Sequence, residues 1–209
     1  MCEVVVMREK PLFSKLYLRE LSNHLIIKLI NKFIYIKQII TVFLLTLLVI
    51  TSSHATNNWR DELPNARVLG SGDFHWFGFK IYHAKLWSQT TPLDMTRPFA
   101  LQLTYNRSIS RRLLVKTVIS EMKRLNGNDV TAVKIQDWQN KLTIAIPDIS
   151  PGDELIGVFL PAQGFRLYSK HGLAADIRDP ELAYYFFGVW LDKQAKDSVL
   201  RSKLIGITP

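Results

Sequence analysis

The fold class is read from residues 153–192, DELIGVFLPAQGFRLYSKHGLAADIRDPELAYYFFGVWLD. Three short runs within it, ELIGVFLP, GFRLYSKHG and LAADI, are punctuated by glycine and proline, which predicts three strands in a meander. Asp179 and Pro180 occupy the cap and first-turn positions of a helix, and the apolar residues that follow predict that helix. This part of the chain is therefore expected to form antiparallel strands followed by a helix.

Upstream of this stretch the sequence predicts another group of strands. Residues 66–88 are dense in β-branched and aromatic residues, with Gly70, Gly72 and Gly78 as bends or bulges, which predicts two or three strands. A polar segment, QTTPLDMTRP, separates them from PFALQLTYN, where we expect a strand over residues 98–106.

Two helices are predicted between these groups of strands. Either Ser108 or Ser110 can cap the first helix. Its apolar residues recur at helical spacing and are Leu113, Leu114, Val118, Ile119, Met122 and Leu125. Either Asn128 or Asp129 can cap the second helix, which ends near Pro147. Its apolar residues are Val130, Val133, Trp138 and Leu142.

A last short helix is predicted over residues 198–205. The resulting order is strands, two helices, strands and then one or two helices, which does not alternate as parallel α/β folds do. The sequence therefore predicts an α+β fold, with an antiparallel sheet and helices packed on one face.

The N-terminal region has the pattern of an export signal. Residues 39–50, IITVFLLTLLVI, are uncharged; lysines precede them, and small residues including Ser53 and Ala55 follow. This order is typical of a signal peptide, and we expect cleavage after Ala55. The alternative is a membrane anchor over residues 38–53, although these 16 residues are fewer than the about 20 of a spanning helix. The expected location is the periplasm or another extracytoplasmic space.

Composition limits the function classes. Residues 1–55 hold the only cysteine, Cys2, and seven of the 27 Lys and Arg residues. The domain expected over residues 56–209 therefore has no disulfide and no thiol nucleophile. Basic residues on the first predicted helix indicate a solvated face rather than a nucleic-acid surface. These are Arg111, Arg112, Lys116, Lys123 and Arg124.

Several segments together resemble the bacterial exported chalcone-isomerase-like proteins. They are LGSGDFHWFGFKIYHAKLW (69–87), PFALQLTYNRSIS (98–110), PDISPGDELIGVF (147–159), DPELAYYFFGVWLD (179–192) and LRSKLIG (200–206). The resemblance implies an open-faced β-sandwich, in which a large antiparallel sheet is covered by a layer of helices and a ligand cleft lies between them. Because this scaffold includes plant isomerases, fatty-acid-binding relatives and members without known activity, fold alone does not give the function.

The resemblance also implies that the isomerase chemistry is not retained. In plant members an arginine, a threonine, a tyrosine and an asparagine hold the substrate phenolate and stabilise the developing enolate. The threonine position falls near Phe77, the tyrosine near Ile109 and the asparagine near Lys116, while Arg67 is the nearest basic candidate for the arginine. Phe77 and Ile109 cannot donate a hydrogen bond, and each lost donor costs about 2.7–4 kcal/mol of transition-state stabilisation.

No metal or cofactor is expected. His75 and His83 are eight residues apart, which on one unbroken strand places them about 26 Å from each other. That distance is too long for both to bind one metal ion.

The expected function is binding of a small apolar or amphipathic molecule, fatty-acid-like or aromatic, without catalysis. By resemblance, the cleft positions are Arg67, Phe77, Tyr82, Tyr105, Ile109 and Lys116. One alternative is an isomerase or lyase using Arg67, Tyr82, Tyr105 or Lys116, and another is a structural or partner-binding domain. No nucleic-acid partner is expected, and membrane contact is expected only through an uncleaved signal segment.

Overall fold

The structure is a computed structural model that describes residues 28, 32–38, 58–127 and 129–207. The chain divides into two compact units, Met1–His54 and Ala55–Pro209. In the first unit, residue 28 and residues 32–38 are helical. Within the described ranges, no helix has the length and apolar character needed to span a bilayer. The apolar run 39–50, nearly all of the alternative anchor 38–53 and the cleavage site after Ala55 lie outside the described residues.

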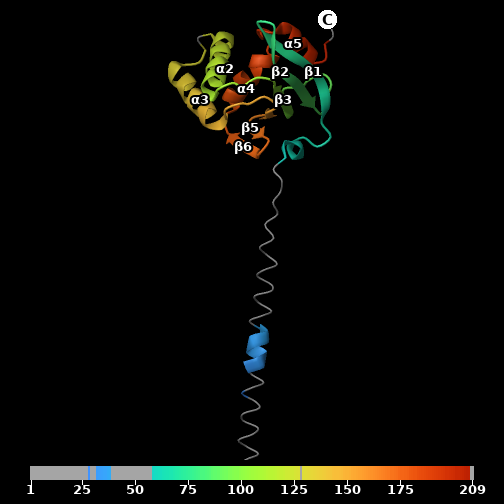
Figure 1. Cartoon of the computed structure of the whole chain (residues 1–209), viewed down its shortest axis with the longest axis vertical. Coiled ribbons are helices and arrows are strands. Elements are labelled where there is room, and N and C mark those ends of the chain that lie inside the picture. The colour runs from blue at the N-terminus through green and yellow to red at the C-terminus, as the bar shows by residue number, and fades with distance from the viewer. Residues whose placement is uncertain (1–27, 29–31, 39–57, 128, 208–209) are drawn as a thin grey trace, which may run out of the picture. The chain divides into compact units, whose positions relative to one another are not determined.

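The second unit is built on one antiparallel sheet of six strands in sequence order (Figure 1). The strands are β1 (Arg67–Trp76), β2 (Phe79–Ser88), β3 (Phe99–Tyr105), β4 (Glu154–Leu160), β5 (Gly164–Ser169) and β6 (Gly172–Ile177). Residues 66–88 thus form two strands, joined by a tight turn at Phe77 and Gly78. The predicted α+β class, the meander and the strand over residues 98–106 are confirmed.

The helices cover one face of this sheet. They are α2 (Arg111–Asn126), α3 (Ala132–Ala145), α4 (Pro180–Leu191) and α5 (Ser198–Leu204), and a 3-10 turn, η1 (Trp59–Glu62), precedes the first strand. Ser110 caps α2, where its hydroxyl accepts a hydrogen bond from the Leu113 N–H, and Asp179 caps α4 in the same way through Leu182. Both helix starts follow the local sequence signals.

The predicted start of α3 was wrong. Thr131, not Asn128 or Asp129, caps this helix, because its hydroxyl accepts a hydrogen bond from the Lys134 N–H. The later start changes which residues face the sheet. Ile135 is buried in place of Val133, which is 81% exposed.

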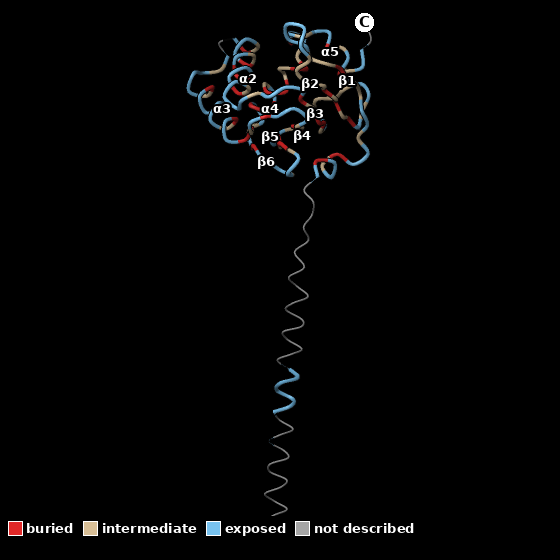
Figure 2. The backbone as a smooth tube through the Cα atoms, in the orientation of Figure 1, coloured by how far each residue is buried: buried red, intermediate tan, exposed pale blue. Residues whose placement is uncertain are grey.

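Side chains alternate between the two faces of the sheet, and each face has its own hydrophobic cluster. Figure 2 shows which parts of the backbone carry the buried residues. The larger cluster lies between the sheet and the helices. The smaller cluster lies on the other face, where Trp59 and Leu63 pack beside β3, β4 and β5. There the carboxylate of Glu62 accepts hydrogen bonds from Arg166 and from the Tyr168 hydroxyl. Both clusters lie wholly within residues 59–204, so the segment 55–209 contains the core that its fold requires.

Helix α5 lies directly on β1. A Cβ atom at Gly70 would lie 1.9 Å from the Lys203 carbonyl oxygen, so only glycine permits this approach. This close packing holds α5 against β1, the edge strand of the sheet.

Candidate ligand cleft

A cleft of about 640 Å³ opens between the β1–β2 hairpin, α2 and the segment joining α4 to α5. Its volume lies within the range of small-molecule sites. Half of the lining residues are apolar: Phe74, Trp76, Ile81, Ile109, Leu113, Leu114, Val118, Val189, Trp190 and Leu200. The strands contribute through their alternation, because Phe74, Tyr82 and Tyr105 all face the helices. The cleft is thus an extension of the larger hydrophobic core to the surface.

Two tyrosines place hydroxyl groups in this apolar lining. Tyr82 accepts a hydrogen bond from the indole N–H of Trp190, with an oxygen–nitrogen distance of 2.9 Å. Tyr105 is only 1% exposed, and no protein group among the described residues hydrogen-bonds its hydroxyl. The two rings meet edge to face at 5.7 Å, and Phe74 stacks on Tyr82 at 4.9 Å. These contacts hold both phenols in fixed positions.

Burial keeps both phenols neutral. Desolvation raises the pKa of Tyr82 well above its ordinary value, and it does the same for the pKa of Tyr105. A neutral phenol can donate a hydrogen bond through its O–H. The Tyr82 oxygen accepts a hydrogen bond from Trp190, so the Tyr82 O–H points away from the indole and is available as a donor. The floor of the cleft therefore offers two hydrogen-bond donors in apolar surroundings.

The cleft does not continue as an open channel beneath the sheet. Beyond Tyr105 a second void has a volume of only about 20 Å³ and shares Leu114, Val118 and Trp190 with the cleft. Stacked and edge-to-face aromatic rings fill this region, among them Phe99, Phe159, Phe165, Phe186 and Phe187. Of these two voids, only the outer cleft has room for a ligand larger than one water molecule.

Charged side chains lie at the cleft mouth. The Glu121 carboxylate forms ion pairs with Arg124 at 2.8 Å and with Lys196 at 3.5 Å. The Asp197 carboxylate caps α5 by accepting a hydrogen bond from the Leu200 N–H. Arg107 and Lys116 also line the cleft, and neither has an ion-pair partner in the described part of the chain. The mouth consequently presents more available positive charge than negative charge.

The structure brings four of the six expected cleft residues to this site. Tyr82, Tyr105, Ile109 and Lys116 line it, whereas Arg67 and Phe77 do not. Arg67 begins β1 opposite Ser88, at the other end of the hairpin, and Phe77 points outward in the turn. Whether any of these residues touches a ligand stays a prediction.

Sequence reasoning missed the bond between Tyr82 and Trp190 and the contribution of Phe74 to the lining. The aromatic run in α4 and the alternation along β1 were the available signals. Neither signal shows which of these residues border a cleft.

The two histidines of the first hairpin lie on different strands, so the assumption of one unbroken strand was wrong. The ring of His83 hydrogen-bonds the Asp73 carboxylate at 2.5 Å, and Lys80 bonds the same carboxylate at 2.9 Å. Hydrogen bonds from Lys80 and His83 hold the pKa of Asp73 below its usual value. In the described ranges, no group of three or more metal-ligating side chains comes together.

Comparison with known proteins gives a family and a fold. A family model described as chalcone isomerase-like matches residues 70–206. Comparison with curated proteins gave no match. The crystal structure of a fatty-acid binding protein from Arabidopsis thaliana superposes with a TM-score of 0.52 and 10% sequence identity, covering 68% of this chain and 88% of that one. At this identity the likeness shows a shared fold.

Proposed function

The chain belongs to the chalcone isomerase-like family, and on this premise we propose that its cleft binds a small amphipathic molecule with an apolar body and an anionic or acceptor group. Binding occurs without catalysis. The observation that carries the proposal is the pairing of an apolar cleft of about 640 Å³ with two buried neutral phenols on its floor.

The lining matches a ligand of this class. Apolar side chains bury the body of the molecule, and the hydroxyls of Tyr82 and Tyr105 donate to an acceptor atom. Arg107 and Lys116 attract an anionic group at the mouth. The solved neighbour is described as a fatty-acid binding protein, which supports a long-chain carboxylate as the ligand class.

The same lining argues against enolate chemistry. Of the positions that resemblance assigns to isomerase donors, Phe77 is at the hairpin tip and Ile109 is apolar. The carboxylates of Glu121 and Asp197 are engaged in ion pairs or a helix cap. Neither Phe77 nor Ile109 can therefore supply the hydrogen bond to an oxyanion that the resemblance assigns to its position.

The test uses palmitate and two matched tryptophan variants. Thr117 on α2 and Thr143 on α3 are both exposed, and each bonds the carbonyl four residues earlier, but only Thr117 lines the cleft. Titration calorimetry should show palmitate binding to the unmodified protein and to Thr143→Trp. Thr117→Trp fills the cleft and should weaken binding by about tenfold or more.

Two results would overturn the proposal. One is equal palmitate affinity in the two tryptophan variants, since the ligand would then lie outside the cleft. The other is conversion of a chalcone to a flavanone by the purified protein, since the cleft would then be an active site.

We further propose that the domain works after export, with residues 1–55 removed. The support is the order of lysines, the apolar run 39–50 and the small residues Ser53 and Ala55. Expression of the full chain in a Gram-negative host, followed by cell fractionation and intact mass measurement, should give a periplasmic species beginning at Thr56. A full-length species in the membrane fraction would instead indicate the anchor.

A further inference from the structure

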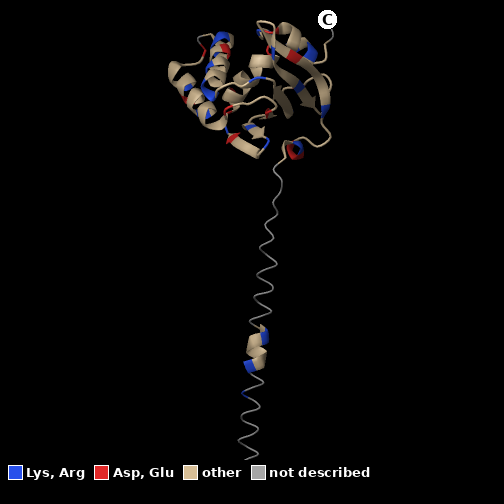
Figure 3. Cartoon of the chain, in the orientation of Figure 1, with Lys and Arg blue, Asp and Glu red and all other residues tan. Residues whose placement is uncertain are grey.

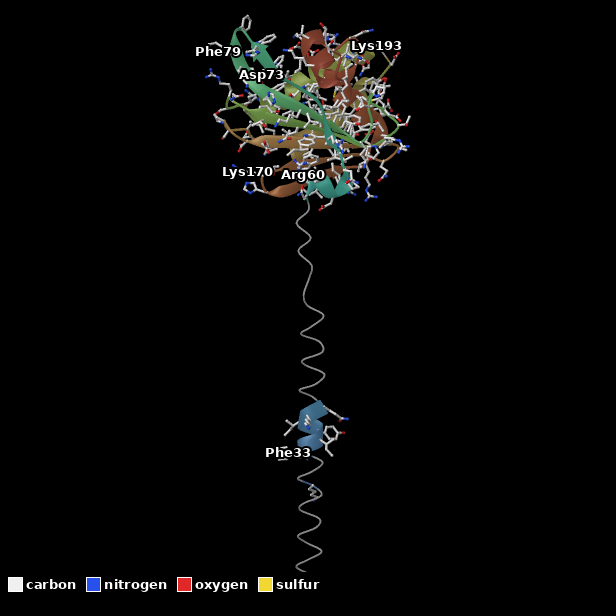
Figure 4. All side chains as sticks on the ribbon, turned by 90° about the vertical axis from the view of Figure 1, so that its right-hand side faces the viewer. Phe33, Arg60, Asp73, Phe79, Lys170 and Lys193 are labelled. Carbon is white, nitrogen blue, oxygen red and sulfur yellow. The ribbon has the colours of Figure 1, made fainter. Side chains whose placement is uncertain are left out.

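Three large aromatic side chains stand exposed at the tip of the first hairpin. The exposed fractions are 48% for Trp76, 85% for Phe77 and 58% for Phe79. Figure 4 shows Phe79 at the end of the hairpin, projecting away from the body of the domain. Soluble proteins expose few contiguous apolar patches, and those that persist usually mark an interaction surface.

The backbone at the tip is poorly suited to phenylalanine. Trp76 pairs with Phe79, so Phe77 and Gly78 form a two-residue loop, with φ values of 48° and 79°. Such loops favour asparagine followed by glycine, because both residues need a positive φ. A bulky residue in this conformation is an outlier. Since Phe77 is also almost fully exposed, the fold gains little from it, and this points to a role outside folding.

A cationic side chain lies against each of two of these rings. The Arg107 guanidinium lies 5.1 Å from the ring centre of Phe79, and the Lys196 ammonium lies 4.9 Å from that of Trp76. The loop after Arg107 leads into α2, where Figure 3 shows further Lys and Arg residues. Among them, Arg111, Arg112 and Lys116 have no ion pair within the described residues. The nearby Asp73 carboxylate is already paired with Lys80 and His83.

We propose that this hairpin tip docks on an anionic lipid bilayer. Phenylalanine side chains enter the boundary between headgroups and acyl chains, tryptophan settles at headgroup level, and lysine and arginine contact anionic headgroups. The same tip adjoins the cleft, because Trp76 also lines it. Docking therefore places the cleft mouth against the lipid. This inference goes beyond the proposed ligand binding and does not depend on it.

The test is sedimentation of residues 55–209 with vesicles, either of phosphatidylcholine alone or of phosphatidylcholine and phosphatidylglycerol in equal parts. We expect binding to the mixed vesicles that weakens as salt is added. Phe77→Asn creates the favoured Asn-Gly turn, so its thermal stability should be equal or higher, while vesicle affinity falls by about tenfold or more. Ile144→Gln removes a residue on α3 that is 86% exposed, and it should leave vesicle binding unchanged.

Tryptophan fluorescence gives an independent readout. Trp76 is exposed, whereas the other four tryptophans are buried or half-buried. Vesicles of brominated lipid should quench the protein through Trp76, and Trp76→Phe should remove most of that quenching while keeping an aromatic ring at the tip.

Several outcomes would overturn docking. One is unchanged vesicle binding by Phe77→Asn. Another is a protein that does not bind vesicles but self-associates through the tip. Analytical ultracentrifugation would then show self-association that Phe77→Asn abolishes. Lipid docking and ligand binding can be told apart, because Phe77→Asn should keep its palmitate affinity and Thr117→Trp should keep its vesicle affinity.

Discussion

At the residue scale, Tyr82 and Tyr105 offer a matched comparison. Both are buried phenols in the cleft floor, but only the Tyr82 hydroxyl has a protein partner, the Trp190 indole N–H. Tyr82→Phe leaves that N–H without an acceptor at a largely buried tryptophan and should lower the free energy of unfolding by about 1–3 kcal/mol. Tyr105→Phe removes a hydroxyl that bonds no described protein group and should change it by less than about 1 kcal/mol.

Urea denaturation of the two variants measures this difference. Palmitate titration then separates the roles, since Tyr105→Phe should lose affinity although it loses little stability. Equal destabilisation by both substitutions would contradict this difference and would mean that the Tyr105 hydroxyl is hydrogen-bonded in the folded protein.

At the element scale, Asp179 holds α4 against α3. Its carboxylate accepts hydrogen bonds from the Leu182 N–H at 2.9 Å, the Trp138 indole at 3.1 Å and the Lys141 ammonium at 2.8 Å. Asp179→Ala removes a helix cap and leaves the buried Trp138 N–H unpaired, so it should lower the free energy of unfolding by about 2–4 kcal/mol. Asp179→Asn can keep the cap and should cost less.

Acid should weaken the same element. Burial by itself raises the pKa of the Asp179 carboxyl, but the Leu182 hydrogen bond and the bond and charge of Lys141 outweigh burial and hold the pKa below its usual value. A lowered pKa means that the stabilisation is present above the unfolded-state pKa of about 3.9 and is lost as pH falls through the folded-state value. Denaturation series from neutral pH downward should show a steeper loss for the unmodified protein than for Asp179→Asn. Parallel curves would contradict this account.

The elements show which parts of the fold a sequence can predict. Asp179, Pro180 and Ser110 carry local cap signals, and the glycines and prolines after residue 153 mark the strand ends, so these elements were predicted correctly. Thr131 was missed because Asn128 and Asp129 are equally good caps by composition, and only packing of Ile135 against the core distinguishes them. Tyr82 and Tyr105 were assigned to the cleft by the family resemblance, because alternation orders the side chains within one strand and does not relate one strand to the next.

The site itself was less accessible from sequence. Its floor depends on a bond between Tyr82 and Trp190, residues on a strand and a helix far apart in the chain. Phe77 was placed in the cleft because an alignment by order cannot tell a strand residue from a turn residue when both lie in one aromatic run. Phe77 is exposed because it lies in a two-residue loop. Asn-Gly or Asp-Gly would indicate such a loop in a sequence, whereas Phe-Gly does not.

At the scale of the whole molecule, the cleft joins elements from both ends of the domain, and ligand binding should therefore stabilise the domain as a unit. The β1–β2 hairpin and α2 come from its first half and the α4–α5 segment from its end. Palmitate at about one hundred times its dissociation constant adds about 2.7 kcal/mol to the free energy of unfolding. For a domain of this size the melting temperature should rise by about 5–10 °C.

Calorimetric scanning with and without palmitate measures that rise, which Thr143→Trp should retain and Thr117→Trp should lose. Hydrogen exchange shows which part of the domain the ligand stabilises. Amides of β1, β2 and α2 border the cleft, whereas β6 lies at the opposite edge of the sheet. Under native conditions, local openings around the cleft should slow in the ligand's presence more than openings at β6. Protection concentrated at β5 and β6 would place the ligand on another surface, and the apolar lining around Tyr82 and Tyr105 would then be an unfilled edge of the core.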